Sequence, residues 1–336
     1  MTQYYLKIKT IESHAAGEPL RVIVDGWPEI PGRTILEKRA FAKAHHDAIR
    51  RALMWEPRGH ADMYGAILTP PVTPDGDLGV LFLHNEGFST MCGHGVIALV
   101  TVVLEIGLLR REGNPAVVRL DTPAGRVTAR ARLKNGRVDR VAFENVPSFA
   151  QELDQDVEVP GLGRVGYHLS FGGAYYAYCD AKDLGVGLDA QDHRAMMDAG
   201  MRVKRAVMAA RPILHPVEKD LGYLYGTILS GPPQGPGANL RNVCIFADGQ
   251  VDRSPTGTGV SGRVAIEYAR GRLQIGEPFV IESMLGTRFT GRVLRESMVG
   301  SYKAVVPEVE GSAEVVGEAE FWMDLRDPAR GTFLLR

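Results

Sequence analysis

The sequence predicts a mixed α/β (α+β) fold made of two strand-rich halves, each wrapped around one helix. Residues 92–96 (Cys-Gly-His-Gly-Val) are echoed at 256–260 (Thr-Gly-Thr-Gly-Val), 256 − 92 = 164 positions later in a chain of 336 residues. Outside these repeats, short alternating apolar segments predominate, whereas a doubly wound parallel sheet requires regular strand–helix alternation. The repeat therefore indicates two related halves, each with a Gly-rich turn that opens a helix.

The individual elements follow from hydrophobic spacing and from turn residues. Strands are expected at 4–24 (with a turn at 16–19), 64–68, 78–83, 117–120, 126–133, 137–143, 165–169, 175–179, 224–229, 243–246 and 314–321. Helices are expected at 34–53, 93–109, 193–210 and 259–270. Asn135-Gly136 is a strong two-residue hairpin signal. We expect a first domain at 1–122, completed by the tail 322–336, and a second domain at 123–321.

Composition and charge restrict the class of protein. Lys and Arg total 39 against 40 Asp and Glu, a net charge of −1, so no field of one sign attracts nucleic acid or an anionic membrane. The longest apolar run, 96–104, is too short to span a bilayer, and the N-terminus does not resemble a signal peptide. Three cysteines do not make a disulfide framework. We expect a soluble, cytoplasmic protein with reduced thiols and no nucleic-acid or membrane partner.

Cys92 is the candidate reactive residue. A thiol just ahead of a helix meets unpaired N–H groups and the positive end of the helix dipole, which lower a thiol pKa from its usual value of ~8.5. Two such turns facing each other would also bind a carboxylate through converging N–H groups. The alternative is a buried core thiol beside glycines that only shape a turn. The matching turn at Thr256 favours the functional interpretation, while Cys179 and Cys244 lie in apolar segments and are expected in the core.

Other motifs leave alternatives open. Residues 257–262 satisfy the G-x-G-x-x-G pattern, but residues 252–256 just before them are not a buried strand and the motif lies late in the chain, which argues against a dinucleotide site. His94 either binds a ligand carboxylate, tunes the Cys92 thiolate, or is exposed at the helix start. Asp252 either caps the second turn or meets a cationic nitrogen of a ligand. The sequence has no recognised metal-binding motif, so no metal is expected.

Four stretches resemble the proline racemase family, which includes proline racemases, 4-hydroxyproline 2-epimerases and trans-3-hydroxy-L-proline dehydratases. They are residues 13–21, 91–95, 170–173 and 252–259. The resemblance implies a fold like diaminopimelate epimerase, with two pseudo-symmetric domains, each a curled β-sheet or barrel around a central helix, and the ligand between them. It also implies a homodimer and a reaction that needs no cofactor.

One departure from the family pattern points to a branch. Racemases and epimerases of this family carry Cys at both turns, whereas the second turn here carries Thr256. This substitution resembles the trans-3-hydroxy-L-proline dehydratases, as do residues 224–229 and the ending 333–335. A Thr hydroxyl has no accessible anion near pH 7, so proton exchange on two faces should fail. One base is sufficient for elimination.

The resemblance therefore implies a lyase that dehydrates trans-3-hydroxy-L-proline to Δ1-pyrroline-2-carboxylate. Cys92 is the expected base, and Thr256 closes the other face of the substrate. Residues expected to contact substrate are Gly93, His94, Asp252, Gly257 and Thr258. A proline racemase or 4-hydroxyproline 2-epimerase is the second hypothesis, and a non-catalytic amino-acid-binding protein is the third.

Overall fold

A computed structural model describes residues 5–324, 326–327 and 333–334. Part of the expected C-terminal addition to the first domain, 322–336, and of the ending 333–335 lies outside the described residues. The chain divides into two compact units, one comprising 1–141 and 312–336 and the other 142–311.

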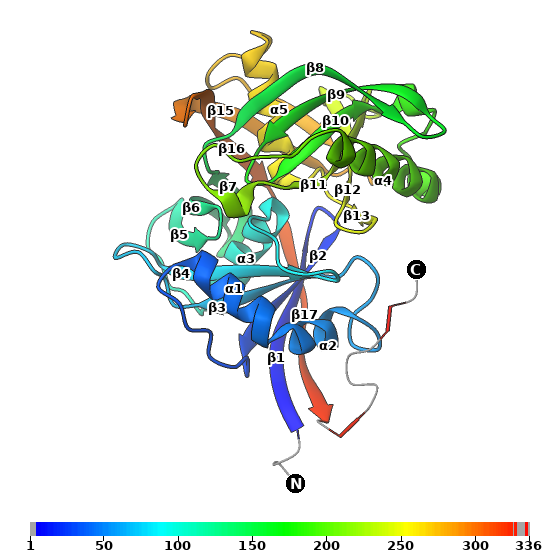
Figure 1. Ribbon diagram of the computed structural model, residues 1–336. Helices are drawn as coiled ribbons and strands as arrows, with labels where there is room; N and C mark the ends of the chain where they lie inside the picture. Colours follow the sequence, from blue (N-terminus) through cyan, green and yellow to red (C-terminus); the bar gives the residue numbers. More distant parts are fainter. Residues whose placement is uncertain (1–4, 325, 328–332, 335–336) are drawn as a thin grey trace. The chain divides into compact units, whose positions relative to one another are not determined.

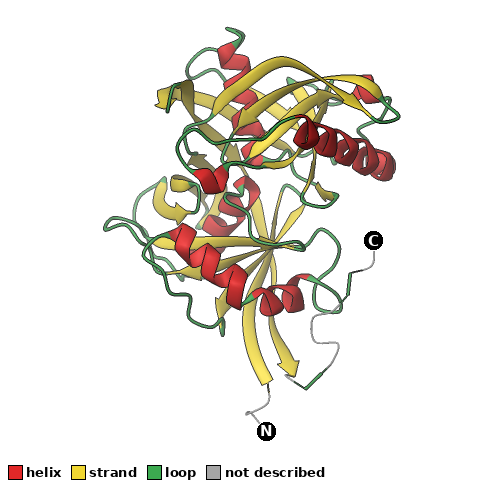
Figure 2. Ribbon diagram, viewed as in Figure 1, coloured by secondary structure: helices red, strands yellow, loops and turns green. Residues whose placement is uncertain are grey.

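The described part of the first unit contains a curled sheet covered by helices (Figures 1 and 2). Its elements are β1 (Tyr5–Ala15), β2 (Glu18–Asp25), α1 (Ile35–His45), α2 (Asp47–Met54), β3 (Tyr64–Thr69), β4 (Leu78–His84), α3 (Gly93–Glu105), β5 (Ala116–Thr122), β6 (Gly125–Lys134) and β17 (Ala313–Asp324). The strand β7 (Arg137–Glu144) begins in this unit and ends in the other.

The second unit is built in the same way. Its elements are β8 (Phe149–Val159), β9 (Gly163–Phe171), β10 (Tyr175–Asp180), the 3₁₀ turns η2 (Ala181–Leu184) and η3 (Ala190–Asp192), α4 (His193–Ala210), η4 (Lys219–Leu221), β11 (Leu224–Gly231), β12 (Leu240–Phe246), β13 (Gln250–Asp252), α5 (Gly257–Ala269), β14 (Phe279–Glu282), β15 (Arg288–Val299) and β16 (Tyr302–Gly311).

The strand order within the two units is equivalent. In the first, β17, β1, β2, β3, β4, β5 and β6 pair in that order, and only β2–β3 and β4–β5 are parallel. In the second, β8, β9, β10, β11, β12, β14 and β15 pair in the equivalent order, and β16 pairs with β15. Of these pairs, only β10–β11 and β12–β14 are parallel. Parallel neighbours need a crossover. In each unit, the connection between the second pair of parallel strands contains the repeated turn and the helix that follows it. This helix is α3 between β4 and β5, and α5 between β12 and β14.

The two repeat helices are the buried centre of their units. Residues 93–103 of α3 and 257–267 of α5 are all buried, although α5 includes Arg263 and Glu267. The α3 helix contacts β1, β2, β6 and β17, whereas α5 contacts β8, β9, β15 and β16. The mixed α/β fold predicted from the sequence, with strands curled around a helix in each half, is confirmed.

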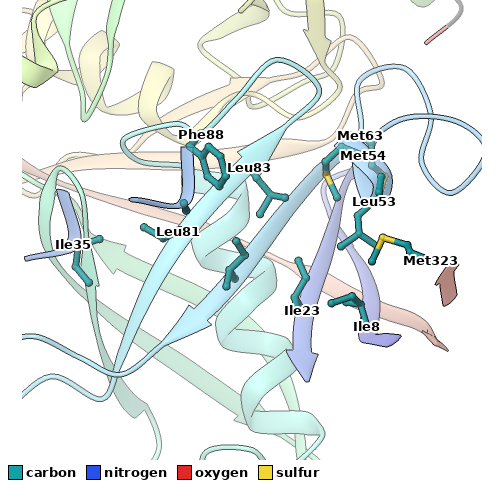
Figure 3. Packing of buried hydrophobic residues seen from close by; sticks show 13 residues of the cluster. Ile8, Ile23, Ile35, Leu53, Met54, Met63, Leu81, Leu83, Phe88 and Met323 are labelled. Carbon is teal, nitrogen blue, oxygen red and sulfur yellow. The ribbon is translucent and has the colours of Figure 1, made fainter. Parts of the chain in front are cut away.

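Strand β4 shows how the first sheet buries both of its faces. Leu81 and Leu83 belong to an apolar cluster with Ile35 of α1 and Leu53 of α2 (Figure 3). Successive side chains of a strand point to opposite faces, so Phe82 points the other way and packs against α3. The sheet is thus a layer between the outer helices and the central one, and the start of α3 is held by packed side chains.

Several expected boundaries differ from those observed. The helix expected at 34–53 is two helices, because His46 leaves the helical conformation (φ −115°, ψ 9°) and accepts a hydrogen bond from the indole N–H of Trp27. The α3 helix ends at Glu105 instead of 109, because Gly107 adopts a positive φ of 73°. Strand β8 was not predicted, because its central residues are polar and its pattern is interrupted by Asp154 at φ 54°.

The expected domain limits, 122/123 and 321/322, also differ from the limits of the compact units. Strand β6 pairs with β5 from Ala116↔Ala131 to Thr122↔Gly125, which keeps it in the first unit. Strand β17 pairs with β1 from Ala15↔Ala313 to Tyr5↔Asp324, so the return to the first unit precedes 322. Among the described residues, no helix combines the length and the apolar character needed to cross a membrane.

Candidate functional site

The first repeated turn places a sulfur atom at the start of α3. Cys92 is the N-cap residue, with extended backbone (φ −146°), and its carbonyl accepts the N–H of Val96 at 3.0 Å. Its Sγ accepts the N–H of Gly95 at 3.2 Å, as a capping side chain does. The sulfur thus occupies the positive end of a buried helix whose first turn has no acidic side chain. Both features stabilise negative charge on sulfur.

Gly95 is required by the close approach of its neighbours. A Cβ at this position would lie 2.7 Å from Cε1 of Phe82 and 2.8 Å from Sγ of Cys92. Real Cβ atoms do not approach other atoms so closely, so only glycine leaves the sulfur in contact with the helix N–H. The second glycine of the repeat therefore has a packing role and an electrostatic one.

His94 lies directly beside the sulfur. Its Nδ1 is 3.2 Å and its Nε2 3.7 Å from Sγ of Cys92, and the side chain is buried. The ring meets the ring of Tyr64 edge-on, with centroids 4.9 Å apart, and the Tyr64 hydroxyl pairs with Ser89 Oγ at 2.5 Å. His94 is therefore not exposed at the helix start. It is held where a ring N–H can donate to the sulfur.

The second turn begins α5 with a different conformation. Thr256 has φ 66° and ψ 96°, whereas Cys92 is extended. A positive φ in a β-branched residue is a genuine outlier and costs about 1–3 kcal/mol. Thr256 Oγ1 is buried and has no hydrogen-bond partner among the described residues, so it does not cap the helix. Strain and an unpaired buried hydroxyl in one residue are typical of a functional position.

Two side chains hold Thr256 in this conformation. Asp252, at the end of β13, accepts the N–H of Ser254 at 2.8 Å, and Ser254 Oγ accepts the N–H of Thr256 at 3.1 Å. These are successive side-chain turns of the Asx and Ser types. Both side chains are buried. Asp252 therefore supports the second turn, as the structural alternative for this residue predicted.

Strand β10 fixes the first turn of α5 through two tyrosines on the same face. The Tyr178 hydroxyl donates to the carbonyl of Gly259 at 2.9 Å, and the Tyr176 hydroxyl lies 2.7 Å from Thr258 Oγ1. A Cβ on Gly259 would lie 2.7 Å from Cδ1 of Ile228 and 3.1 Å from Cβ of Thr256. Gly259 therefore has the same packing role as Gly95, 164 positions earlier.

The expected site residues gather at two turns, one in each unit. Cys92, Gly93 and His94 form the first, and Asp252, Thr256, Gly257 and Thr258 form the second; all seven are buried. The supporting residues Tyr64, Tyr176 and Ser254 were not among the expected site residues. The alternation in Tyr-Tyr-Ala-Tyr at 175–178 indicated that two tyrosines share a face, but not which helix they meet.

The other two cysteines lie on strands of the second unit, outside the repeated turns, and Cys244 is the register partner of Asp252. Cys179 is on β10 and Cys244 on β12, and both are buried and form no disulfide. Burial raises the pKa of Cys179 to about 12, so it remains a neutral thiol at physiological pH. Across the described part of the chain, no three His, Cys, Asp or Glu side chains are grouped as a metal site would require.

Comparison with known proteins assigns the chain to a family. The family model for proline racemase matches residues 10–334, nearly the whole sequence. The chain belongs to the proline racemase family. The resemblance stated from residues 13–21, 91–95, 170–173 and 252–259 is therefore confirmed.

Individual relatives differ in the activity that their names state. A trans-3-hydroxy-L-proline dehydratase from Burkholderia cenocepacia is 46% identical over 329 residues, covering 98% of both chains. A 3-hydroxyproline 2-epimerase from Burkholderia multivorans is also 46% identical, with the same coverage. Among solved structures, a hydroxyproline epimerase from Agrobacterium vitis with bound trans-4-hydroxy-L-proline superposes with a TM-score of 0.92 at 29% identity, covering 98% of this chain and 96% of its own.

The role of Gly95 leads to a stability prediction. Gly→Ala normally stabilises a helix interior, by about 1 kcal/mol. Gly95→Ala should instead destabilise the protein by about 1–3 kcal/mol, because the new methyl group overpacks Phe82 and the sulfur. Urea unfolding measures the change, and iodoacetamide labelling should show altered reactivity of Cys92.

Gly87→Ala is the matched control, because a Cβ at Gly87 meets nothing within 4 Å. This variant should stay within about 0.5 kcal/mol of the wild type. A Gly95→Ala protein as stable as the wild type would contradict the packing argument.

Proposed function

We propose that this protein dehydrates trans-3-hydroxy-L-proline to Δ1-pyrroline-2-carboxylate, as a hydro-lyase that uses Cys92 as its only base. The observation that carries the proposal is the difference between the two equivalent turns. One has a sulfur atom stabilised by a helix N–H, and the other has an unpaired threonine hydroxyl. The near-full-length relatives named as dehydratases support the same reaction.

Cys92 removes the proton from Cα of the substrate. The Gly95 N–H and the adjacent His94 ring favour the thiolate that this step needs. The C–H bond breaks, the proton passes to sulfur, and the electron pair remains on Cα. Hydrogen bonds to the substrate carboxylate and the positive charge on the ring nitrogen stabilise this carbanion.

Elimination follows on the same face. The 3-hydroxyl of the substrate is trans to the carboxylate, so it lies on the same side of the ring as the Cα hydrogen. The C3–O bond breaks as the carbanion pair forms a C2=C3 double bond. The proton carried by Cys92, delivered directly or through water, leaves with the hydroxyl as water. The resulting enamine tautomerises to Δ1-pyrroline-2-carboxylate, and no oxidant or cofactor is required.

Thr256 closes the opposite face without returning a proton. Its hydroxyl is too weak an acid to replace the second thiol of a racemase. Because Thr256 Oγ1 is buried and unpaired, a ligand group or water can bind there without displacing a protein partner. The strained backbone of Thr256 keeps the hydroxyl out of the capping position that Cys92 Sγ occupies in its own turn.

The remaining turn residues bind the substrate in this proposal. The backbone N–H groups at the starts of α3 and α5, from Gly93, His94, Gly257 and Thr258, receive the carboxylate, since helix N-termini favour anions. The Asp252 carboxylate meets the ring nitrogen while also accepting the Ser254 N–H. We further propose a cytoplasmic location, where thiols stay reduced, and a homodimeric state, by resemblance to the family.

An epimerase acting on 3-hydroxyproline is the second candidate, favoured by the name of the Burkholderia multivorans relative. It requires a group other than Thr256 that delivers a proton to the second face of Cα. Among the described residues, Cys179 and Cys244 are the other cysteines, and both are buried in strands, outside the repeated turns that carry Cys92 and Thr256. The dehydratase therefore remains the preferred proposal.

Product formation tests the reaction. Wild-type protein incubated with trans-3-hydroxy-L-proline should yield Δ1-pyrroline-2-carboxylate, detected by chromatography. Cys92→Ser should lower the rate about 10³-fold or more, because the base is lost. Cys179→Ala is the control and should retain activity, because that thiol is buried on β10. Absence of product from the folded wild type would contradict the proposal.

Restoring the second thiol tests the role of the other face. Thr256→Cys should gain measurable conversion of L-proline to D-proline, because each turn then carries a proton donor or acceptor. Thr256→Ser, which keeps a hydroxyl, should show none. Chiral chromatography measures both. A folded Thr256→Cys protein that still dehydrates substrate but inverts no proline would argue against opposed turns.

A further inference from the structure

The hydroxyl of Thr258, in the first turn of α5, lies against the hydroxyl of Tyr176 on β10. Tyr176 Oη and Thr258 Oγ1 are 2.7 Å apart, and both side chains are buried. Among the described residues, neither hydroxyl has any other hydrogen-bond partner. The pair is therefore an isolated two-hydroxyl unit at the start of the helix.

The surroundings of the pair decide which hydroxyl donates. Two hydroxyls share one proton between them, and the second proton points elsewhere. Tyr176 is packed among the rings of Tyr178 and Tyr225, with centroids 6.2 and 5.8 Å away, and Thr258 Oγ1 is the hydrogen-bond partner that its hydroxyl has among the described residues. Burial raises the pKa of Tyr176 well above its ordinary value, so it keeps its proton. Tyr176 is therefore the donor and Thr258 the acceptor.

This direction leaves the Thr258 hydroxyl with a proton to give. A hydroxyl that accepts a hydrogen bond becomes a better donor, because successive hydrogen bonds polarise one another. The adjacent N–H groups of the α5 N-terminus favour an anionic acceptor. We propose that Tyr176 is a positioning residue that orients the Thr258 hydroxyl as a hydrogen-bond donor to the carboxylate of the substrate. This inference rests on the function proposed above and deepens it.

The arrangement is specific to the second turn. The residue equivalent to Thr258 in the first turn is His94, because 258 − 164 = 94. Its neighbouring tyrosine, Tyr64, presents a ring to His94, while its hydroxyl pairs with Ser89. The first turn therefore uses its aromatic neighbour to hold an imidazole beside sulfur. The second uses it to orient a hydroxyl.

Binding of L-proline measures how much the Tyr176–Thr258 pair contributes to carboxylate binding, since L-proline has the same carboxylate but no 3-hydroxyl to eliminate. Tyr176→Phe should weaken L-proline binding, measured by calorimetry, about three- to tenfold, the range of one hydrogen bond. KM for trans-3-hydroxy-L-proline should rise by a similar factor, whereas kcat should change less than about twofold. The affinity for L-prolinamide should change less, because its neutral carboxamide oxygen is a weaker acceptor than a carboxylate oxygen.

Tyr175→Phe is the matched control. Tyr175 precedes Tyr176 on β10, points to the opposite face, and donates its hydroxyl hydrogen bond to Gln151. Loss of this hydroxyl should leave L-proline affinity unchanged. Equal losses of affinity in Tyr175→Phe and Tyr176→Phe would overturn the inference, because they would reflect general loosening of the strand.

A double-mutant cycle tests the coupling itself. In a Thr258→Val background, Tyr176→Phe should weaken L-proline binding no further, because the hydroxyl that it orients is already gone. Thr258→Ser should bind L-proline more tightly than Thr258→Val, and this pair tests the hydroxyl without altering Tyr176. Additive losses, or equal affinities of the Ser and Val variants, would overturn the inference.

The two proposals fail in distinguishable ways. If the wild type forms product normally but Tyr176→Phe, correctly folded by circular dichroism, binds L-proline as the wild type does, the positioning role alone is wrong. If the wild type neither binds L-proline nor dehydrates trans-3-hydroxy-L-proline, the proposed function is wrong and the inference is overturned with it.

Discussion

The hydrogen bond from the Gly95 N–H to the sulfur of Cys92 is the contact on which the proposed chemistry depends. It exists because Gly95 has no side chain, because Phe82 presses against the first turn of α3, and because α3 is buried inside a curled sheet. Each condition is set by how the first turn of α3 packs against the sheet around it. The central helix thereby supplies, at the position of the thiol, an N–H that has no partner within the helix and the positive end of the helix dipole.

The second unit repeats this construction and changes its outcome at one residue. The strand order, the parallel crossover and the two glycines of the turn are equivalent, yet Thr256 has a positive φ and its hydroxyl does not cap α5. The side chains of Asp252 and Ser254 accept backbone hydrogen bonds that hold that conformation, and tyrosines of β10 fix the following turn. In our proposal, a fold suited to a proton-transferring thiol at each turn therefore has one such thiol, Cys92, and one hydroxyl, Thr256.

The sequence predicted the features that depend on local pattern. The repeat at 92–96 and 256–260 predicted both central helices, and the glycine spacing predicted tight turns at their starts. The features that it could not predict depend on particular side-chain contacts, some of them between residues far apart in the sequence. The conformation of Thr256 is imposed by side chains of preceding residues, and the Tyr176–Thr258 pair joins residues 82 positions apart. The break of the first helix at His46 likewise depends on Trp27, 19 positions earlier.

The central claim is that Cys92 is the only base. Hydrogen exchange at Cα of L-proline in deuterated water tests it most directly, because L-proline lacks the 3-hydroxyl that elimination would remove. One thiolate acting on one face can remove the proton and return a deuteron to the same face. The account predicts deuterium at Cα with the L configuration retained, measured by mass spectrometry and chiral chromatography. Accumulation of D-proline at the rate of deuterium uptake would show a second proton donor opposite Cys92 and would contradict the account.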